Sequence, residues 1–172
     1  MKKKVQFKKG DKVISYGRIY QVFKIKKEEV KKGKKDQVVY LKPYFQTRRN
    51  KSLVYSIPLG HVDKTRLRRP LCQKELNRLF KRLAKKPRSQ KSVNISRLKD
   101  ILTSNDAFET AQVLRVLWAD KLDQSTNFTA SKQKVFKSAL KKLDQEVSLV
   151  KKISRKEGRK KIKQALKKMK KK

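Results

Sequence analysis

The hydrophobic pattern of this chain changes once, near residue 70, and the change separates two segments that must fold differently. Up to Arg69 the apolar residues lie in short runs rich in β-branched and aromatic side chains, separated by glycine, asparagine or charged turns. From Pro70 onward they recur at positions i, i+3, i+4 and i+7, the spacing of one face of an α-helix. Because the two patterns occupy separate segments, we expect an α+β chain in which a β domain precedes a helical domain.

The first segment, residues 1–69, is predicted to contain four or five short strands. Runs of strand-forming residues lie at 13–14, 20–25, 38–42 and 53–58. Gly17 interrupts the first run as a bend would, and the charged residues 31–36 form a hairpin loop. Pro58 then stops pairing, because it has no N–H to donate. Short strands joined by tight turns predict a small curled barrel of SH3 or Tudor type.

The second segment is predicted to form four helices over residues 70–150. Prolines bound the first helix, and the second starts near Asn94. Asp106 caps the third helix, and Thr129 or Ser131 caps the fourth. Helices of this length joined by short polar loops predict a compact antiparallel bundle.

The charge of the chain indicates a polyanionic partner. The sequence holds 52 Lys+Arg against 14 Asp+Glu, a formal net charge of +38. This excess is more than solubility requires, and nucleic acid is the default partner for it. Most of the basic side chains are lysines, which contact phosphates as point charges and read bases poorly, so we expect duplex DNA to be bound without sequence preference.

The last segment, residues 151–172, holds 13 basic residues and a single acid, Glu157. Its apolar residues have helical spacing and are Ile162, Ala165, Leu166 and Met169. Alone in water, however, repulsion between like charges at i and i+4 disfavours a helix. We therefore expect a lysine-rich, disordered arm that grips phosphates.

Motifs for catalysis, cofactors and metals are missing from the sequence. There is no glycine-rich phosphate loop, nucleophile elbow or pair of catalytic carboxylates, so we expect neither an enzyme nor a cofactor. His61 has no ligand partner at metal-binding spacing and is interpreted as an exposed turn residue. Cys72, the single cysteine, is expected to be a small, semi-buried residue at a helix start. Trp118 lies on an apolar stripe and is interpreted as a core anchor rather than a base-stacking residue.

The sequence contains no apolar run of about 18 residues and no secretory signal pattern. We therefore expect a cytoplasmic, nucleoid-associated monomer without membrane contact.

Several short runs resemble the CarD/CdnL family of bacterial RNA-polymerase-binding transcription regulators, over most of the chain before its tail. Residues 7–13 resemble the family's F-x-x-G-D-x-V start, and residues 94–97 resemble N-W-S-R. Residues 102–106 and 111–118 then resemble L-x-S-G-D and A-x-V-V-R-D-L-W, in the same order and at near-identical spacing. Each run is short, and the ordered set carries the resemblance.

The resemblance implies a helical domain that touches promoter DNA through Asn94, Ile95, Ser96 and Arg97. In the family, the tryptophan of this motif leans into the minor groove beside the melted region and favours the open complex. Ile95 stands in its place and offers less area and no indole N–H, although isoleucine can also act as a minor-groove wedge. Arg97 matches the family's arginine and can hold a backbone phosphate.

The resemblance also implies a barrel domain that docks on the RNA polymerase β subunit. We expect an edge strand to pair with a strand of the partner, and its residues are Leu53, Val54, Tyr55, Ser56 and Ile57. Ser56 stands where many members carry an arginine, but pairing between main chains does not depend on that side chain.

Three alternatives remain open at this stage. Lysines along the strands serve equally well to block the edge against partners. Ile95 is either an exposed wedge or a core residue that packs beside Leu98. The whole chain is either a CarD-like regulator or a ribosome- or nucleoid-associated basic architectural protein.

Overall fold

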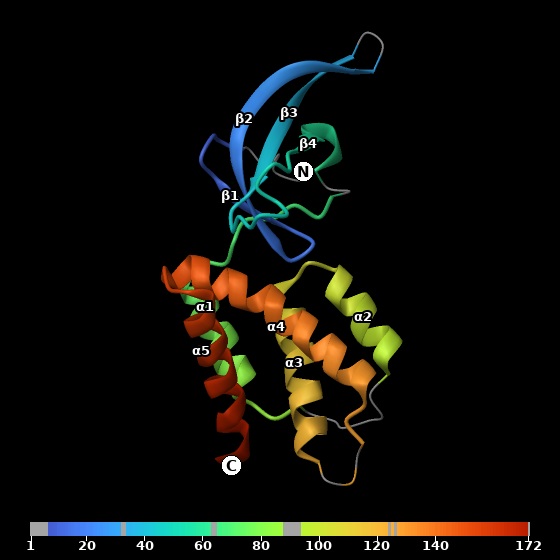
Figure 1. Ribbon diagram of the computed structural model, residues 1–172, viewed down its shortest axis with the longest axis vertical. Helices are drawn as coiled ribbons and strands as arrows, with labels where there is room; N and C mark the ends of the chain where they lie inside the picture. Colours follow the sequence, from blue (N-terminus) through green and yellow to red (C-terminus); the bar gives the residue numbers. More distant parts are fainter. Residues whose placement is uncertain are drawn as a thin grey trace. The chain divides into compact units, whose positions relative to one another are not determined.

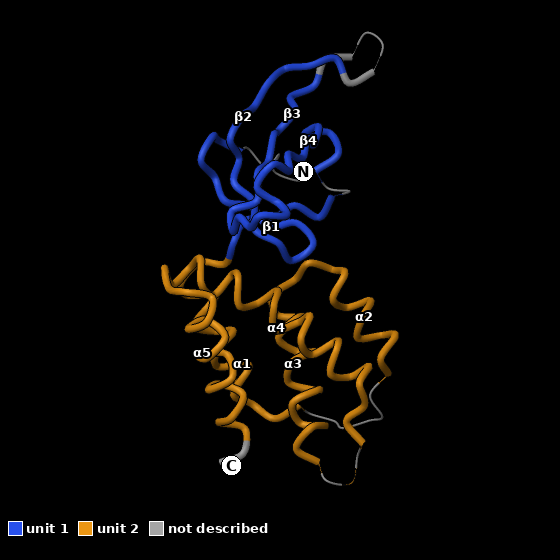
Figure 2. The backbone as a smooth tube through the Cα atoms, in the orientation of Figure 1, with its two compact units in different colours: residues 1–70 blue, residues 71–172 orange. Residues whose placement is uncertain are grey.

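The computed structural model describes residues 7–31, 34–62, 65–87, 94–123, 125 and 127–171. The chain divides into two compact units, residues 1–70 and residues 71–172 (Figure 2). Within the described residues, a four-stranded antiparallel sheet makes up the first unit and five α-helices the second (Figure 1). This order of elements confirms the predicted α+β class. We call the two parts the β unit and the helical unit.

The sheet of the β unit has the strand order β1-β2-β3-β4. Its strands are β1 (Lys12–Ser15), β2 (Arg18–Lys31), β3 (Lys34–Pro43) and β4 (Tyr55–Pro58). β2 and β3 form a long curved hairpin (Figure 1) and reach into the predicted loop at 31–36, of which residues 32 and 33 lie outside the described residues. Gly17, with φ 72°, takes the left-handed conformation that the turn from β1 to β2 requires.

The two edges of the sheet differ. At one edge, Ile14 of β1 exchanges two backbone hydrogen bonds with Arg68, with N···O distances of 2.8 and 3.0 Å. This isolated bridge occupies part of the β1 edge. At the other edge, β4 pairs only with β3 in the part of the chain that the structure describes. The core between these edges is formed by Phe7, Val13, Tyr20, Val22, Val39, Leu41, Val62 and Leu67.

The helical unit is built around α3, which is buried on most of its sides. Its helices are α1 (Gln73–Leu83), α2 (Ile95–Thr103), α3 (Ala107–Leu122), α4 (Ala130–Lys151) and α5 (Arg155–Lys167). α3 packs against α1, α2 and α4, whereas α5 packs against α1 and α4. The predicted caps form, since the Asp106 side chain accepts from the Glu109 N–H, and Thr129 rather than Ser131 caps α4. Cys72, the N-cap residue of α1, is exposed and not semi-buried as expected.

The expected disorder of the C-terminal segment is wrong for residues 155–167, which form α5. The apolar residues with helical spacing in this segment are all buried in the core of the helical unit. Ile162 and Leu166 are both fully buried, and burying a side chain of this size contributes about 1.5–3 kcal/mol. Repulsion between lysines disfavours this helix in isolation, but within the helical unit the packing of its apolar face outweighs that repulsion.

A buried carboxylate fixes α5 on α4. Asp144 of α4 is 0% exposed, and each of its oxygens accepts two hydrogen bonds from one arginine of α5. Arg155 donates from Nε and Nη2 at 3.2 and 3.1 Å, and Arg159 donates at 3.1 and 2.6 Å. Such forked pairs combine charge with fixed geometry. Gly158 allows this close approach, because a Cβ there would lie 2.6 Å from the Ser148 hydroxyl oxygen.

Candidate functional site

The predicted edge strand is shorter in the structure than in the sequence analysis. β4 begins at Tyr55, so Leu53 and Val54 precede the strand instead of belonging to it. The Leu53 N–H donates to the carbonyl of Asn50 at 3.1 Å, which places Leu53 at the end of a turn. Ser56 is exposed, and Ile57 is half-buried against the core of the β unit.

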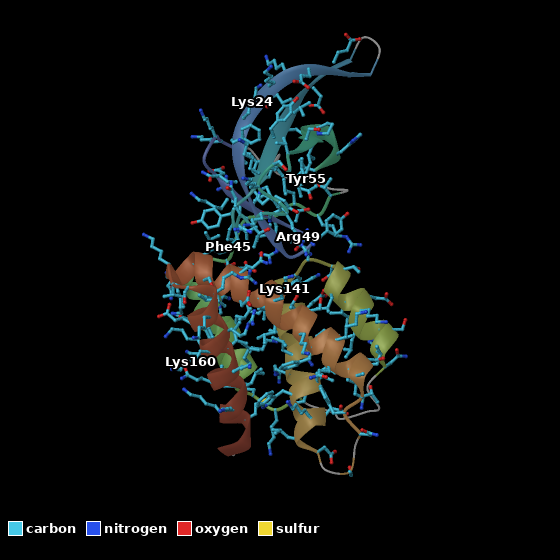
Figure 3. All side chains as sticks on the ribbon, viewed as in Figure 1. Lys24, Phe45, Arg49, Tyr55, Lys141 and Lys160 are labelled. Carbon is cyan, nitrogen blue, oxygen red and sulfur yellow. The ribbon has the colours of Figure 1, made fainter. Side chains whose placement is uncertain are left out.

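An exposed apolar surface nevertheless lies at the start of this edge strand. Leu53 is 40% exposed, Val54 49% and Tyr55 39%. The Tyr55 ring is held in place by an edge-to-face contact with Tyr20, with ring centroids 5.2 Å apart. Exposed apolar residues next to an edge strand offer a surface on which another protein could pack. We call Leu53, Val54 and Tyr55 the β4 surface (Tyr55 is labelled in Figure 3).

β2 and β3 also carry an aromatic and basic face that was not predicted from the sequence. Phe23 and Tyr40 meet edge to face, with Lys42 Nζ 4.4 Å from the Phe23 ring centroid and Lys24 Nζ 5.6 Å from that of Tyr40. The hydroxyl of Tyr40 donates to Glu28 at 2.6 Å, and this hydrogen bond raises the pKa of Tyr40. A register shift between Val22 and Lys24 brings these residues together, and simple alternation in the sequence does not reveal it.

The predicted DNA-contacting residues lie at the N-terminus of α2. The side-chain oxygen of Asn94, the N-cap residue, accepts from the Arg97 N–H at 3.1 Å. Asn94, Ser96 and Arg97 are exposed. Their side chains, together with the positive end of the helix dipole, suit a phosphate.

Ile95 falls between its two interpretations. Its side chain is half-buried and packs against the core of the helical unit, so part of it serves folding. The remaining part is accessible beside three exposed polar neighbours. The structure therefore leaves a small apolar contact available at the N-terminus of α2.

Two residues of the family-like motif at 111–118 stabilise the fold of the helical unit. Arg115 is buried and donates to the carbonyls of Lys85 and Lys86 at 2.8 and 2.7 Å, which holds the segment after α1 against α3. Burial, with a smaller effect of the Arg82 charge, lowers the pKa of Arg115. Trp118 is half-buried and stacks on Phe136 with ring centroids 6.1 Å apart, which confirms its interpretation as a core anchor.

The part of the chain that the structure describes contains no candidate metal site and no candidate membrane-spanning helix. No group of three or more His, Cys, Asp or Glu side chains there could hold a metal ion. No described helix is both long enough and apolar enough to cross a membrane. His61 is exposed at the end of a short 3-10 helix, Leu59–His61, as expected for a turn residue.

The fold and these surfaces define a class of protein, a basic α+β chain in which a β unit precedes a helical unit. The CarD C-terminal domain family matches residues 77–163, slightly more than half of the 172 residues. The chain therefore belongs to the CarD family, whose members are transcription regulators rather than enzymes. No curated protein matches the chain. The match covers the N-terminus of α2 and most of the helical unit.

Proposed function

We propose that this protein docks on the β subunit of bacterial RNA polymerase through its β unit and contacts promoter DNA through its helical unit. Membership of the CarD family carries the proposal, because the matched residues include Asn94–Arg97 at the N-terminus of α2. A protein that binds the open promoter complex more tightly than the closed one stabilises the open complex by the difference in its affinities. A difference of about 1–2 kcal/mol shifts the equilibrium by roughly five- to thirtyfold.

The β4 surface supports docking of a protein partner. β4 is an edge strand, and main-chain pairing at such an edge gives affinity while the flanking side chains give specificity. Val54 is half-exposed and precedes the residues that pair with β3, which start at Tyr55. It can therefore be changed without removing a bond of the β3–β4 ladder.

The experiment is capture of purified polymerase β subunit by the full chain and by the variant Val54→Pro. The variant removes one N–H from the beginning of the edge and replaces the branched valine side chain by the proline ring, so capture should fall at least tenfold. A Ser52→Ala variant, changed at an exposed position of the turn before the strand with its N–H kept, serves as the control and should keep capture. Unchanged capture by Val54→Pro, with the β unit folded by circular dichroism, would contradict docking through β4.

The alternative, a ribosome- or nucleoid-associated architectural protein, is favoured by the charge of +38. Capture from a nuclease-treated lysate distinguishes the two functions. Retention of polymerase subunits supports the regulator, and retention of ribosomal proteins alone supports the alternative.

A further inference from the structure

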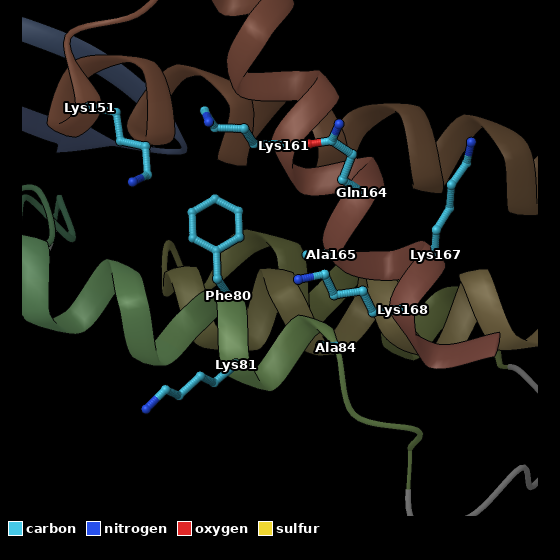
Figure 4. A pocket seen from close by; sticks show the side chains of 9 residues that line it. All are labelled: Phe80, Lys81, Ala84, Lys151, Lys161, Gln164, Ala165, Lys167 and Lys168. Carbon is cyan, nitrogen blue, oxygen red and sulfur yellow. The ribbon is translucent and has the colours of Figure 1, made fainter. Parts of the chain in front are cut away.

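A hollow lined by lysines lies within the helical unit, away from the N-terminus of α2. It has a volume of about 920 Å³, is open to solvent and lies between α1, the end of α4 and α5 (Figure 4). In Figure 1, α2 and α5 lie on opposite sides of the helical unit, so the hollow and Asn94–Arg97 are separate surfaces. Neither the family match nor the proposed function requires it.

Basic side chains surround an aromatic ring in this hollow. The Phe80 ring of α1 lies among the side chains of Lys151, Lys161 and Lys168 (Figure 4). Lys151 Nζ lies 5.8 Å from the ring centroid. The floor is mostly apolar, and no acidic side chain lines it. An occupant must therefore carry negative charge and an apolar or aromatic part together.

We propose that the hollow binds single-stranded nucleic acid, with phosphates on the lysines and a base stacked on Phe80. A cationic groove with an aromatic platform is the combination that holds single strands without reading their sequence. Gln164 is the one uncharged polar side chain in the lining, so little is available to read base edges. The bases of a duplex are already stacked in pairs and cannot reach the ring, which sets this site apart from a duplex-binding surface.

The test compares two double variants of the full chain that carry the same charge. Lys161→Ala with Lys168→Ala changes the hollow, whereas Lys160→Ala with Lys163→Ala removes two exposed lysines of α5 that do not line it. Binding of a labelled ten-nucleotide oligothymidylate is measured by fluorescence anisotropy. The first pair should weaken binding about tenfold and the second less than about twofold, because only the first removes phosphate contacts within the hollow. Equal losses would overturn the proposal.

Two further measurements separate stacking from charge. Phe80→Leu keeps an apolar side chain without the ring and should weaken oligothymidylate binding about fivefold, while Phe80→Tyr should bind as the wild type does. Melting curves of both variants show whether the helical unit stays folded. For a ten-base-pair duplex, the affinities of the two double lysine variants should differ by less than about twofold. The assignment to single strands would be overturned if a folded Phe80→Leu variant bound oligothymidylate with wild-type affinity. It would also be overturned if the two double lysine variants differed tenfold in their affinity for the duplex. The purified chain alone is used, so these results do not depend on docking to polymerase.

Discussion

Among the residues that the structure describes, five large apolar side chains are exposed in the β unit, namely Tyr16, Tyr44, Leu53, Val54 and Tyr55, and none is exposed in the helical unit. The helical unit instead covers its surface with lysines, such as Lys141 and Lys160 (Figure 3). Both units are strongly basic, so net charge does not distinguish them. The distribution of exposed apolar area does distinguish them, and it is the reason for proposing a protein partner for the β unit and a polyanion for the helical unit.

The core of the helical unit depends on its C-terminal segment, and deleting this segment is expected to have the largest effect on stability. Deleting residues 151–172 removes Ile162 and Leu166 from the core and uncovers the faces of α1 and α4 that α5 covers. The helical unit should lose most of its stability, because each of these side chains contributes about 1.5–3 kcal/mol. NMR spectra should show collapse of the helical-unit signals while those of the β unit remain. Retention of both sets of signals would mean that α5 is dispensable.

Substitution of the buried Asp144 is expected to have the second largest effect on the stability of the helical unit. Asp144→Asn leaves Arg155 and Arg159 without their full partner, and we expect a loss of about 2–3 kcal/mol in the free energy of unfolding. The loss is smaller than for a wholly buried pair, because the two arginine side chains are 33% and 47% exposed. Denaturant unfolding of the variant measures it, with the exposed Asp100→Asn on α2 as the control. Equal midpoints for the two variants would contradict a stabilising pair.

Ile95 tests whether the helical unit presents any apolar contact to DNA. Since the side chain is half-buried, Ile95→Ala should cost about 1–2 kcal/mol, less than truncation of a full core residue. If Ile95 also acts as a minor-groove wedge, Ile95→Ala should shorten the lifetime of the promoter open complex and Ile95→Trp should lengthen it. A lifetime unchanged in both variants would assign Ile95 to the core alone.

The smallest effect concerns pH and the N-terminus of α5. The Ser154 hydroxyl donates to the Glu157 carboxylate at 2.7 Å, and the Ser154 N–H does so at 2.9 Å. These hydrogen bonds lower the pKa of Glu157 below its ordinary value. The ionised carboxylate therefore stabilises the helical unit above its ordinary pKa, and this contribution is lost as the pH falls through the lowered value. The melting temperatures of the wild type and Glu157→Ala should differ at neutral pH and converge in acid. A constant difference would exclude ionisation as its source.

Local patterns in the sequence were sufficient for the order of elements from β1 to α4. The helical spacing after Pro70, the cap at Asp106 and the bend at Gly17 each depend on a few neighbouring residues, and each appears in the structure. The start of β4 was misplaced by two residues, because the strand-forming run at Leu53–Val54 continues a turn closed by a hydrogen bond to Asn50. The sequence also predicted that a helix starts near Asn94, but it did not predict how far Ile95 is buried.

What the sequence by itself determined is the division into a β unit and a helical unit, since hydrophobic period and turn residues act over short distances. Only the tertiary structure decided the state of the last segment. Its apolar spacing and its repelling lysines were both visible, but the outcome depends on Asp144, which is more than ten residues away along the chain, and on the uncovered faces of α1 and α4. The hollow around Phe80 has the same origin. Its lysines come from α1, α4, α5 and the short 3-10 helix η2 (Lys168–Lys171). They converge because burial of one apolar face brings these elements together.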